Sequence, residues 1–334
     1  MRRMGKSTLE FDRPPSILSH AAVGGKKEAE GPLGDQFDQT FGDTTLQADS
    51  WEKAEAQLQK EAVSIALKKA GLGPEGVDFI LAGDLLNQCI SSTFGLMDFQ
   101  VPFLGQYGAC STMAQTLLMA SILVESGAAG KALAVTSSHF CSAERQFRLP
   151  LEYGGQRAPT AQWTATASGC VLVGVGGPIK VRKGLAGKVQ DLGVKDPANM
   201  GAAMAPAAAH SIFQFLEDTH TRPEDYDGIF TGDLGMVGSQ LLYQCLDANG
   251  VDLRPVHQDC GLLLYDRERQ DVHAGGSGCG CSAGVLCGHL LRRMGKGELK
   301  NILFCATGAL MSPTSQQQGL AIPGVCHVVQ LTVG

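Results

Sequence analysis

The sequence predicts an α/β protein built from two similar halves, and three observations lead to this prediction. Segments with helical periodicity alternate along the chain with short apolar runs of strand length. Glycine is abundant, at 43 residues, whereas aromatic residues make up only 6% of the chain, which suits many tight turns between strands and helices. In addition, residues 66–85 resemble residues 215–234 when the chain is shifted by 149 positions.

The length and charge of the chain restrict what it can do. A chain of 334 residues can form one large domain or two similar ones with a substantial core. Its net charge of −6 and the lack of a basic run argue against nucleic acid as a partner. We find neither a signal peptide nor an apolar run of about 18 residues, so we expect no membrane-spanning helix. The 11 cysteines then indicate reduced thiols in a cytosol-like compartment.

The first half is expected to begin with an arm and a helix. Residues 1–48 are polar and broken by glycine and proline, so we expect an extended arm or a hairpin there. Residues 50–70 carry apolar side chains at helical spacing. Asp49 or Ser50 can cap this helix at its start, and Gly71 can end it.

Three strands are predicted to follow in the first half, at residues 77–82, 132–136 and 165–175. The first of them ends near Asp84 and the second near His139. Open α/β sheets bind ligands at the carboxyl ends of their strands. Asp84 is therefore either a site residue or the cap of the following loop, and His139 is either a neighbour of the site or a surface histidine.

A single cysteine precedes the most apolar helix of the first half. Cys110 lies in the run Gln-Tyr-Gly-Ala-Cys-Ser-Thr-Met at residues 106–113, and helical spacing continues to about residue 124. Ser111 or Thr112 can cap this helix, which would place Cys110 at its N-terminal mouth. The helix dipole there lowers the pKa of a thiol and favours the reactive thiolate. The alternative is that Cys110 is a small buried residue that fills a tight turn.

The internal repeat divides the chain into two halves. Eight of twenty positions are identical between residues 66–85 and 215–234, and both segments end in Gly-Asp-Leu. The second Gly-Asp-Leu includes Asp233. A Gly-Cys-Ser run at residues 280–282, followed by a helix and a strand, corresponds to Ala-Cys-Ser around Cys110. We therefore expect an arm at residues 1–48, a first half at 49–176 and a second half at 177–334.

Two polar clusters of the second half are candidates for chemistry. One surrounds His257, and the other is the glycine-rich run 271–281, which contains Ser277 and Cys279. Glycines there allow the backbone to approach a ligand or another strand closely. Structural zinc sites use Cys pairs separated by two to four residues, so the Cys-x-Cys spacing of this run argues against zinc. A pairing of Cys110 with His257 fits better, because an imidazole can activate a thiol.

These features resemble those of the thiolase superfamily, and within it of the ketoacyl synthase III-type condensing enzymes. The resemblance spans about residues 50–334 and implies a five-layered αβαβα fold and a homodimer. It places the family's nucleophile at Cys110 and its histidine at His257. The family's asparagine would fall on or near Cys279. This departure removes an amide donor from the groups that stabilise an oxyanion.

A closer resemblance rests on three long strings at residues 107–113, 199–208 and 271–281. They are similar to the stage V sporulation protein AD family of spore-forming bacteria. This resemblance implies a thiolase-fold protein that binds dipicolinic acid, free or as its calcium chelate. Such a protein acts with other proteins of its operon to move the compound into the developing spore. It is implied to be peripheral to the spore's inner membrane.

Two functions from different classes follow from this sequence. In the first, the protein is a ligand-binding component of a transport assembly. Its ligand, a small flat dianion, would suit the N–H groups at the helix mouths, and Asp84 could help to hold a Ca²⁺ chelate. We expect no cofactor and no bound metal apart from Ca²⁺ carried with the ligand. The expected ligand-binding residues are Asp84, Cys110, His139, His257, Ser277 and Cys279.

In the second function, the protein is an acyl-CoA or acyl-carrier-protein condensing or acyl-transfer enzyme. Cys110 would then be the nucleophile and His257 the base. A purely structural subunit is a third possibility. The residues alone favour the enzyme, whereas the resemblance favours the binding protein.

Overall fold

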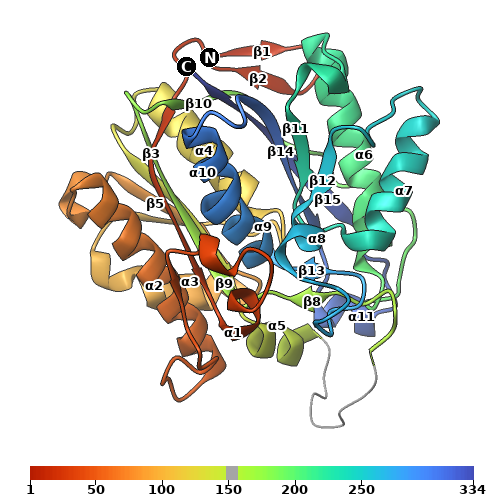
Figure 1. Ribbon diagram of the computed structural model, residues 1–334, viewed down its shortest axis with the longest axis horizontal. Coiled ribbons are helices and arrows are strands. Elements are labelled where there is room, and N and C mark those ends of the chain that lie inside the picture. The colour runs from red at the N-terminus through yellow and green to blue at the C-terminus, as the bar shows by residue number, and fades with distance from the viewer. Residues whose placement is uncertain (148–156) are drawn as a thin grey trace.

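The computed structural model describes residues 1–147 and 157–334. Figure 1 shows five layers, in which two sheets lie on either side of a central layer of helices and an outer layer of helices covers each sheet. The five-layered αβαβα fold predicted from the sequence is therefore confirmed. Within the described part of the chain, each helix is too short or too polar to cross a membrane.

The two sheets have the same strand order. The first contains β3 (Ser16–Gly24), β5 (Phe79–Gly83), β6 (Phe103–Gly105), β7 (Ala132–Ser138) and β9 (Ala167–Gly174), ordered β6-β5-β7-β9-β3. The second contains β10 (Ile179–Leu185), β11 (Gly228–Thr231), β12 (His257–Asp259), β14 (Asn301–Ala309) and β15 (Gly324–Val333), ordered β12-β11-β14-β15-β10. A short antiparallel pairing of β3 with β10 joins the two sheets.

The helices fill the other three layers. The outer layers are α2 (Trp51–Ala70) with α3 (Ile90–Leu96), and α6 (Met200–Thr219) with α7 (Gly235–Asp247). The central layer holds α4 (Thr112–Glu125), α9 (Cys279–Val285), a π-helical turn (Leu286–Leu290) and α10 (Leu291–Gly295). Helix α4 packs against strands of both sheets, so it belongs to the shared core.

Short elements lie at the edges of these layers. The strands are β1 (Arg2–Met4), β2 (Thr8–Glu10), β4 (Gln39–Thr40), β8 (Trp163–Thr164) and β13 (Gly276–Ser277). The helices are α1 (Lys26–Ala29), α5 (Phe140–Phe147), α8 (Cys260–Leu264) and α11 (Pro313–Gln317). Strands β8 and β13 form a separate two-stranded sheet that joins the two halves.

The internal repeat is visible in the helix ends. Shifting α2 by 149 positions places both of its ends on those of α6, and each helix leads through a one-turn 3₁₀ helix into β5 or β11. Ser50 caps α2 by accepting a hydrogen bond from the Lys53 amide, and Gly71 ends it with φ 65°. These local predictions are confirmed, because capping and glycine stops depend on neighbouring residues alone.

Two local expectations differ from the structure. Residues 1–48 begin with a hairpin of β1 and β2, one of the two expected forms, but they are not separate from the first half, because β3 lies inside the first sheet between β9 and β10. Its residues Ala21, Ala22 and Val23 are fully buried. The helix expected to follow the Gly-Cys-Ser run at residues 280–282 instead begins before it, at Cys279, and is interrupted by the π-helical turn.

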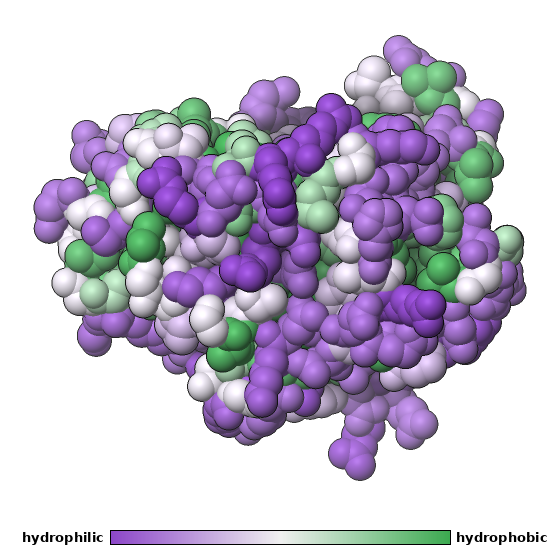
Figure 2. Space-filling view, turned by 90° about the horizontal axis from the view of Figure 1, so that it is seen from above, coloured by the Kyte–Doolittle hydropathy of each residue, from purple (hydrophilic) through white to green (hydrophobic). Residues whose placement is uncertain are grey.

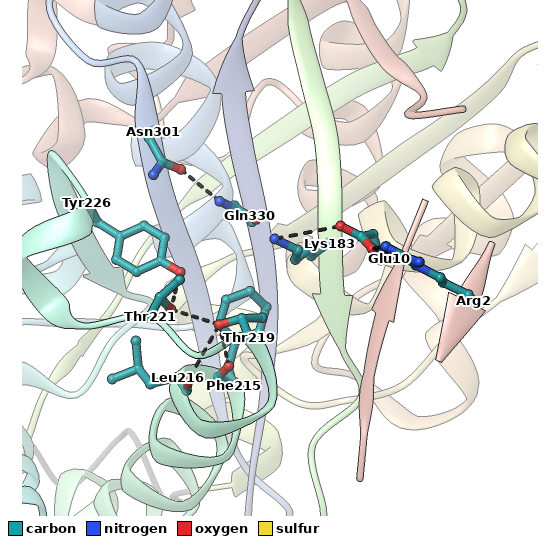
Figure 3. A network of polar contacts seen from close by, with 10 residues as sticks. All are labelled: Arg2, Glu10, Lys183, Phe215, Leu216, Thr219, Thr221, Tyr226, Asn301 and Gln330. Carbon is teal, nitrogen blue, oxygen red and sulfur yellow. Dashed lines mark hydrogen bonds and ion pairs between the residues drawn. The ribbon is translucent and has the colours of Figure 1, made fainter. Parts of the chain in front are cut away.

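The hairpin of β1 and β2 is fastened to the second half by Asp218. Its carboxylate accepts hydrogen bonds from the amides of Lys6, Ser7 and Thr8 and from the Thr8 hydroxyl. Gly5 has φ +50°, and an added Cβ would lie 2.1 Å from Asp218 Oδ1, so the turn requires glycine. Figure 3 shows that Glu10 on β2 also pairs with Arg2 and with Lys183 on β10.

We predict that Asp218→Ala lowers the free energy of unfolding by about 2–3 kcal/mol, because several buried donors lose their acceptor. These hydrogen bonds hold the pKa of Asp218 below its usual value despite partial burial. This contribution to stability is therefore present at neutral pH and is lost as the pH falls through the lowered pKa. Urea unfolding measures both effects. The control Asp98→Ala, which removes one exposed ion pair, should change stability by less than about 0.5 kcal/mol.

Candidate functional site

The candidate site is a small cavity where the two halves meet. It has a volume of about 30 Å³ and lies at the mouth of α4, beside the end of β14. Tyr107, which is 42% exposed, lies at its solvent side. Most of its lining is apolar, and the polar side chains that reach it come from both halves. The lining residues are Leu85, Tyr107, Ala109, Cys110, Ala143, Glu144, Phe147, Thr164, Met200, Ser277, Ala309 and Met311.

Cys110 lies at the mouth of α4, as predicted, on a strained turn. Ala109 has φ 49°, a conformation that costs free energy in a residue with a side chain and is common at functional sites. The turn is closed by the Ser111 hydroxyl, which donates to the Gly108 carbonyl at 2.6 Å. Ser111 occupies the N-cap position, but its side chain does not cap the helix. The predicted capping hydrogen bond is therefore wrong.

Asp233 is the polar centre of the site. It follows β11, and its side chain is completely buried. Its Oδ2 accepts hydrogen bonds from the Ser277 hydroxyl at 3.1 Å and the Gly278 amide at 2.9 Å. Its Oδ1 accepts from the Thr307 hydroxyl at 2.9 Å. One carboxyl group thus connects β13, the start of α9 and β14, and Cys110 contacts this network through the Ser277 hydroxyl.

The surroundings of Cys110 do not activate its thiol. Burial raises the pKa of Cys110 well above its usual value, and the nearby Asp233 carboxylate raises it further. Its Sγ lies 4.0 Å from the Ser277 hydroxyl, which is not a base. The prediction of a lowered thiol pKa is wrong, because the helix dipole is outweighed by burial and by a neighbouring negative charge.

The structure does not bring His257 to Cys110. His257 begins β12 and pairs with Ile229, four residues before Asp233, and it is not among the residues that line the cavity. The Thr231 hydroxyl donates to Asp259 and therefore accepts from His257 Nε2, while the Tyr243 hydroxyl donates to Nδ1. Burial lowers the pKa of His257 to about 4. It is a neutral, structural histidine.

Asp84 and His139 also have structural partners. Asp84 accepts from the Leu86 amide at 2.9 Å, and from the amide and hydroxyl of Ser92 at 2.8 and 2.6 Å. His139 donates a hydrogen bond from Nε2 to the Thr44 carbonyl, and its Nδ1 accepts one from the Cys141 amide. Neither side chain is among those that line the cavity.

Ser277 and Cys279 are placed close to Cys110. Ser277 lines the cavity, and Cys279 packs with Cys110, Leu85 and Ala143 in one apolar cluster. The Cys279 thiol donates to the Ser137 carbonyl at 2.8 Å, so it supplies no amide to the site. Of the six predicted ligand-binding residues, Cys110 and Ser277 face the cavity, and Cys279 lies behind its wall.

Sequence reasoning missed Asp233 as a site residue. The internal repeat aligned it with Asp84, and that alignment was the available signal. The two aspartates have different roles, because Asp84 binds the start of α3 whereas Asp233 binds the cavity wall. Among the residues that the structure describes, no group of three His, Cys, Asp or Glu side chains is arranged to hold a metal ion.

Comparisons with known proteins agree with this fold. Solved structures of 3-oxoacyl-[acyl-carrier-protein] synthase III from Aquifex aeolicus (13% identical, TM-score 0.56) and of Xanthomonas campestris OleA bound with cerulenin (14% identical, TM-score 0.61) are similar. The first match covers 95% of this chain and 99% of the other, and the second covers 97% and 98%. These identities support a shared thiolase-like fold and no more.

A much closer relative is the stage V sporulation protein AD of Bacillus subtilis (strain 168). It is 46% identical over 330 residues, which cover 98% of this chain and 97% of the relative. The profile of the family described as stage V sporulation protein AD (SpoVAD) matches residues 5–332. The chain therefore belongs to the stage V sporulation protein AD family.

Proposed function

We propose that this protein binds dipicolinate in the cavity between Cys110 and Ser277, as one component of the assembly that moves the compound into the developing spore. The observation that carries this proposal is a cavity with polar groups from both halves, in a member of a sporulation family with a condensing-enzyme fold. Its partners would be other proteins of its operon, at the inner membrane of the forespore.

The size of the cavity suggests how the ligand enters. A volume of about 30 Å³ holds one or two water molecules, so it has room for a carboxylate group rather than for the whole ligand. We infer that one carboxylate lies between Cys110 and Ser277 and that the pyridine ring contacts Met200 and Met311 nearer the mouth. Methionine side chains are flexible and adapt to flat apolar groups.

The charge of the cavity bears on whether the ligand binds with or without Ca²⁺. Glu144 contributes a carboxylate to the cavity wall and would repel a free dianion. A Ca²⁺ ion chelated by the ligand would neutralise the ligand's charge beside Glu144. We therefore propose that the protein accepts the free acid anion or its calcium chelate, and the two forms are compared in the test below.

Acyl transfer through Cys110 is supported by the fold and by the position of the thiol. It is opposed by the electrostatics, because a buried thiol beside Asp233 is held in its neutral, poorly nucleophilic form. His257, the base that acyl transfer would need, is occupied elsewhere. We therefore favour binding over catalysis.

Calorimetric titration of the purified protein with dipicolinate, with and without Ca²⁺, should show saturable binding that benzoate does not reproduce. Ala143→Leu adds three carbons to the cavity wall and should weaken binding at least about tenfold, or ~1.4 kcal/mol. Ala128→Leu, the same change at an exposed position, should leave binding unchanged. Absence of binding at millimolar dipicolinate, or equal affinity of the two variants, would contradict the proposed site.

We also propose a homodimer formed through β6. Among the strands of residues 1–147 and 157–334, β6 ends the sheet order and pairs only with β5, so one side of its backbone is open to another strand. Large apolar side chains are exposed on β6 and around it: Phe94, Met97, Phe103, Leu104 and Tyr107. The face drawn in Figure 2 is, by contrast, mostly hydrophilic, with apolar residues in small separate patches. A second copy would cover this apolar edge.

Light scattering coupled to size-exclusion chromatography should give twice the monomer mass of 35.1 kDa. Leu104→Lys places a charge on the proposed interface and should yield the monomer. The control Leu192→Lys changes a side chain that lies away from β6 and is 71% exposed. It should leave the dimer intact. A monomeric wild-type protein at micromolar concentration would refute the dimer.

A further inference from the structure

The hydrogen bonds around Asp233 determine what the cavity can bind. The Asp233 carboxylate accepts from Ser277 and Gly278 on Oδ2 and from Thr307 on Oδ1, so both of its oxygens are occupied by donors. No ion pair between described residues includes Asp233. Its negative charge is therefore stabilised by donated hydrogen bonds alone.

One of these donors, Ser277, also faces the cavity. Ser277 and Cys110 line it, with 4.0 Å between Oγ and Sγ. A hydroxyl or thiol carries only one proton. The Ser277 proton is directed at Asp233, so in the Ser277–Cys110 contact the thiol is the donor and its proton is directed at the Ser277 oxygen. Toward the cavity, the two side chains therefore present acceptor lone pairs. A carboxylate ligand needs donors, so it must compete with Asp233 for the Ser277 proton.

We propose that Asp233 makes ligand binding proton-coupled, an inference that rests on the proposed function. Asp233 takes up one proton when a carboxylate binds and releases the Ser277 hydroxyl to the ligand. The step is balanced, because a proton from solvent joins the Asp233 carboxylate while the Ser277 proton turns from Asp233 to the ligand oxygen. The net charge of the site is then unchanged, because the proton neutralises Asp233 as the ligand's carboxylate brings in one negative charge.

The surroundings place this proton on Asp233. Burial, together with the charge of Asp259, raises the pKa of Asp233 to about 7 against the opposing effect of its hydrogen bonds. Asp259 keeps its own donors, Thr231 and the amides of Leu234 and Gly235, none of which line the cavity. The other titratable groups that sense Asp233 are the thiols of Cys110, Cys260, Cys279, Cys281 and Cys326. Burial raises the pKa of each, so they stay neutral in this range.

The direction of the pH dependence follows from this competition. Binding raises the pKa of Asp233, so affinity is highest at low pH, where the carboxyl group is already protonated. Above pH 7, binding should weaken by about tenfold for each unit of pH, until the pKa of the complex is reached. An account without proton uptake predicts the same affinity at pH 7.5 and 8.5, because dipicolinate is a dianion at both.

The test is calorimetric titration of the full-length protein with dipicolinate at pH 8 in phosphate and in Tris, whose ionisation enthalpies differ. The difference in observed heat gives the number of protons taken up per ligand, and we expect close to one. Asp233→Asn, which cannot titrate, should bind with no proton uptake and with an affinity that does not change with pH. Asp227→Asn, a matched change at the opposite end of β11, should retain the uptake.

Each outcome separates this inference from the proposed function. Binding without proton uptake, or uptake that persists in Asp233→Asn, overturns the inference and leaves dipicolinate binding intact. Absence of any binding overturns both. Should Asp233→Asn fail to fold, the wild-type affinities at pH 7.5 and 8.5 decide the question, because equal values refute proton coupling.

Discussion

The site depends on one interaction, the hydrogen-bonded contact of the buried Asp233 carboxyl group with groups from three elements. Ser277 and Gly278 come from β13 and the start of α9, and Thr307 comes from β14. Cys110, at the mouth of α4, contacts this group through the Ser277 hydroxyl. Because β13 pairs with β8 of the first half, this contact also holds the two halves at a fixed separation. A buried carboxylate without these donors would cost several kcal/mol, so the cavity and the network that supports it must form together.

The two duplicated halves use their equivalent aspartates, Asp84 and Asp233, in different ways. The two halves share strand order, and their long outer helices α2 and α6 have the same length. Each half places an aspartate within two residues of the end of β5 or β11. In the first half, Asp84 is used to hold the start of α3 through Ser92. In the second half, Asp233 faces the helix mouths. The pseudo-symmetric fold therefore supplies two equivalent positions, and one of them is free to shape a binding site.

The fold could be predicted from sequence to a large extent, because its elements are encoded locally. The Ser50 cap, the Gly71 stop and the apolar strand before Asp84 each depend on a few adjacent residues. The internal repeat then indicated that the fold consists of two similar halves. The position of β3 could not be predicted in this way, because its insertion between β9 and β10 is decided by contacts with residues more than a hundred positions away.

The site was harder to predict, for a physical reason. Strand register decides which side chains lie level with a cavity. His257 lies at the start of β12, opposite Ile229 and away from the cavity, although the sequence around it resembles a family motif. The pKa of Cys110 depends on burial and on Asp233, which is 123 positions away in the chain. Ser277 was identified because the glycine-rich run around it indicated a close backbone approach.

The most direct test of this account is a crystal structure of the protein with dipicolinate. We predict one ligand carboxylate between Cys110 Sγ and Ser277 Oγ, with Asp233 behind them and the pyridine ring near Met200 and Met311. A ligand bound at another place, such as the groove of about 720 Å³ between α2 and α3, with the cavity beside Cys110 empty, would contradict it.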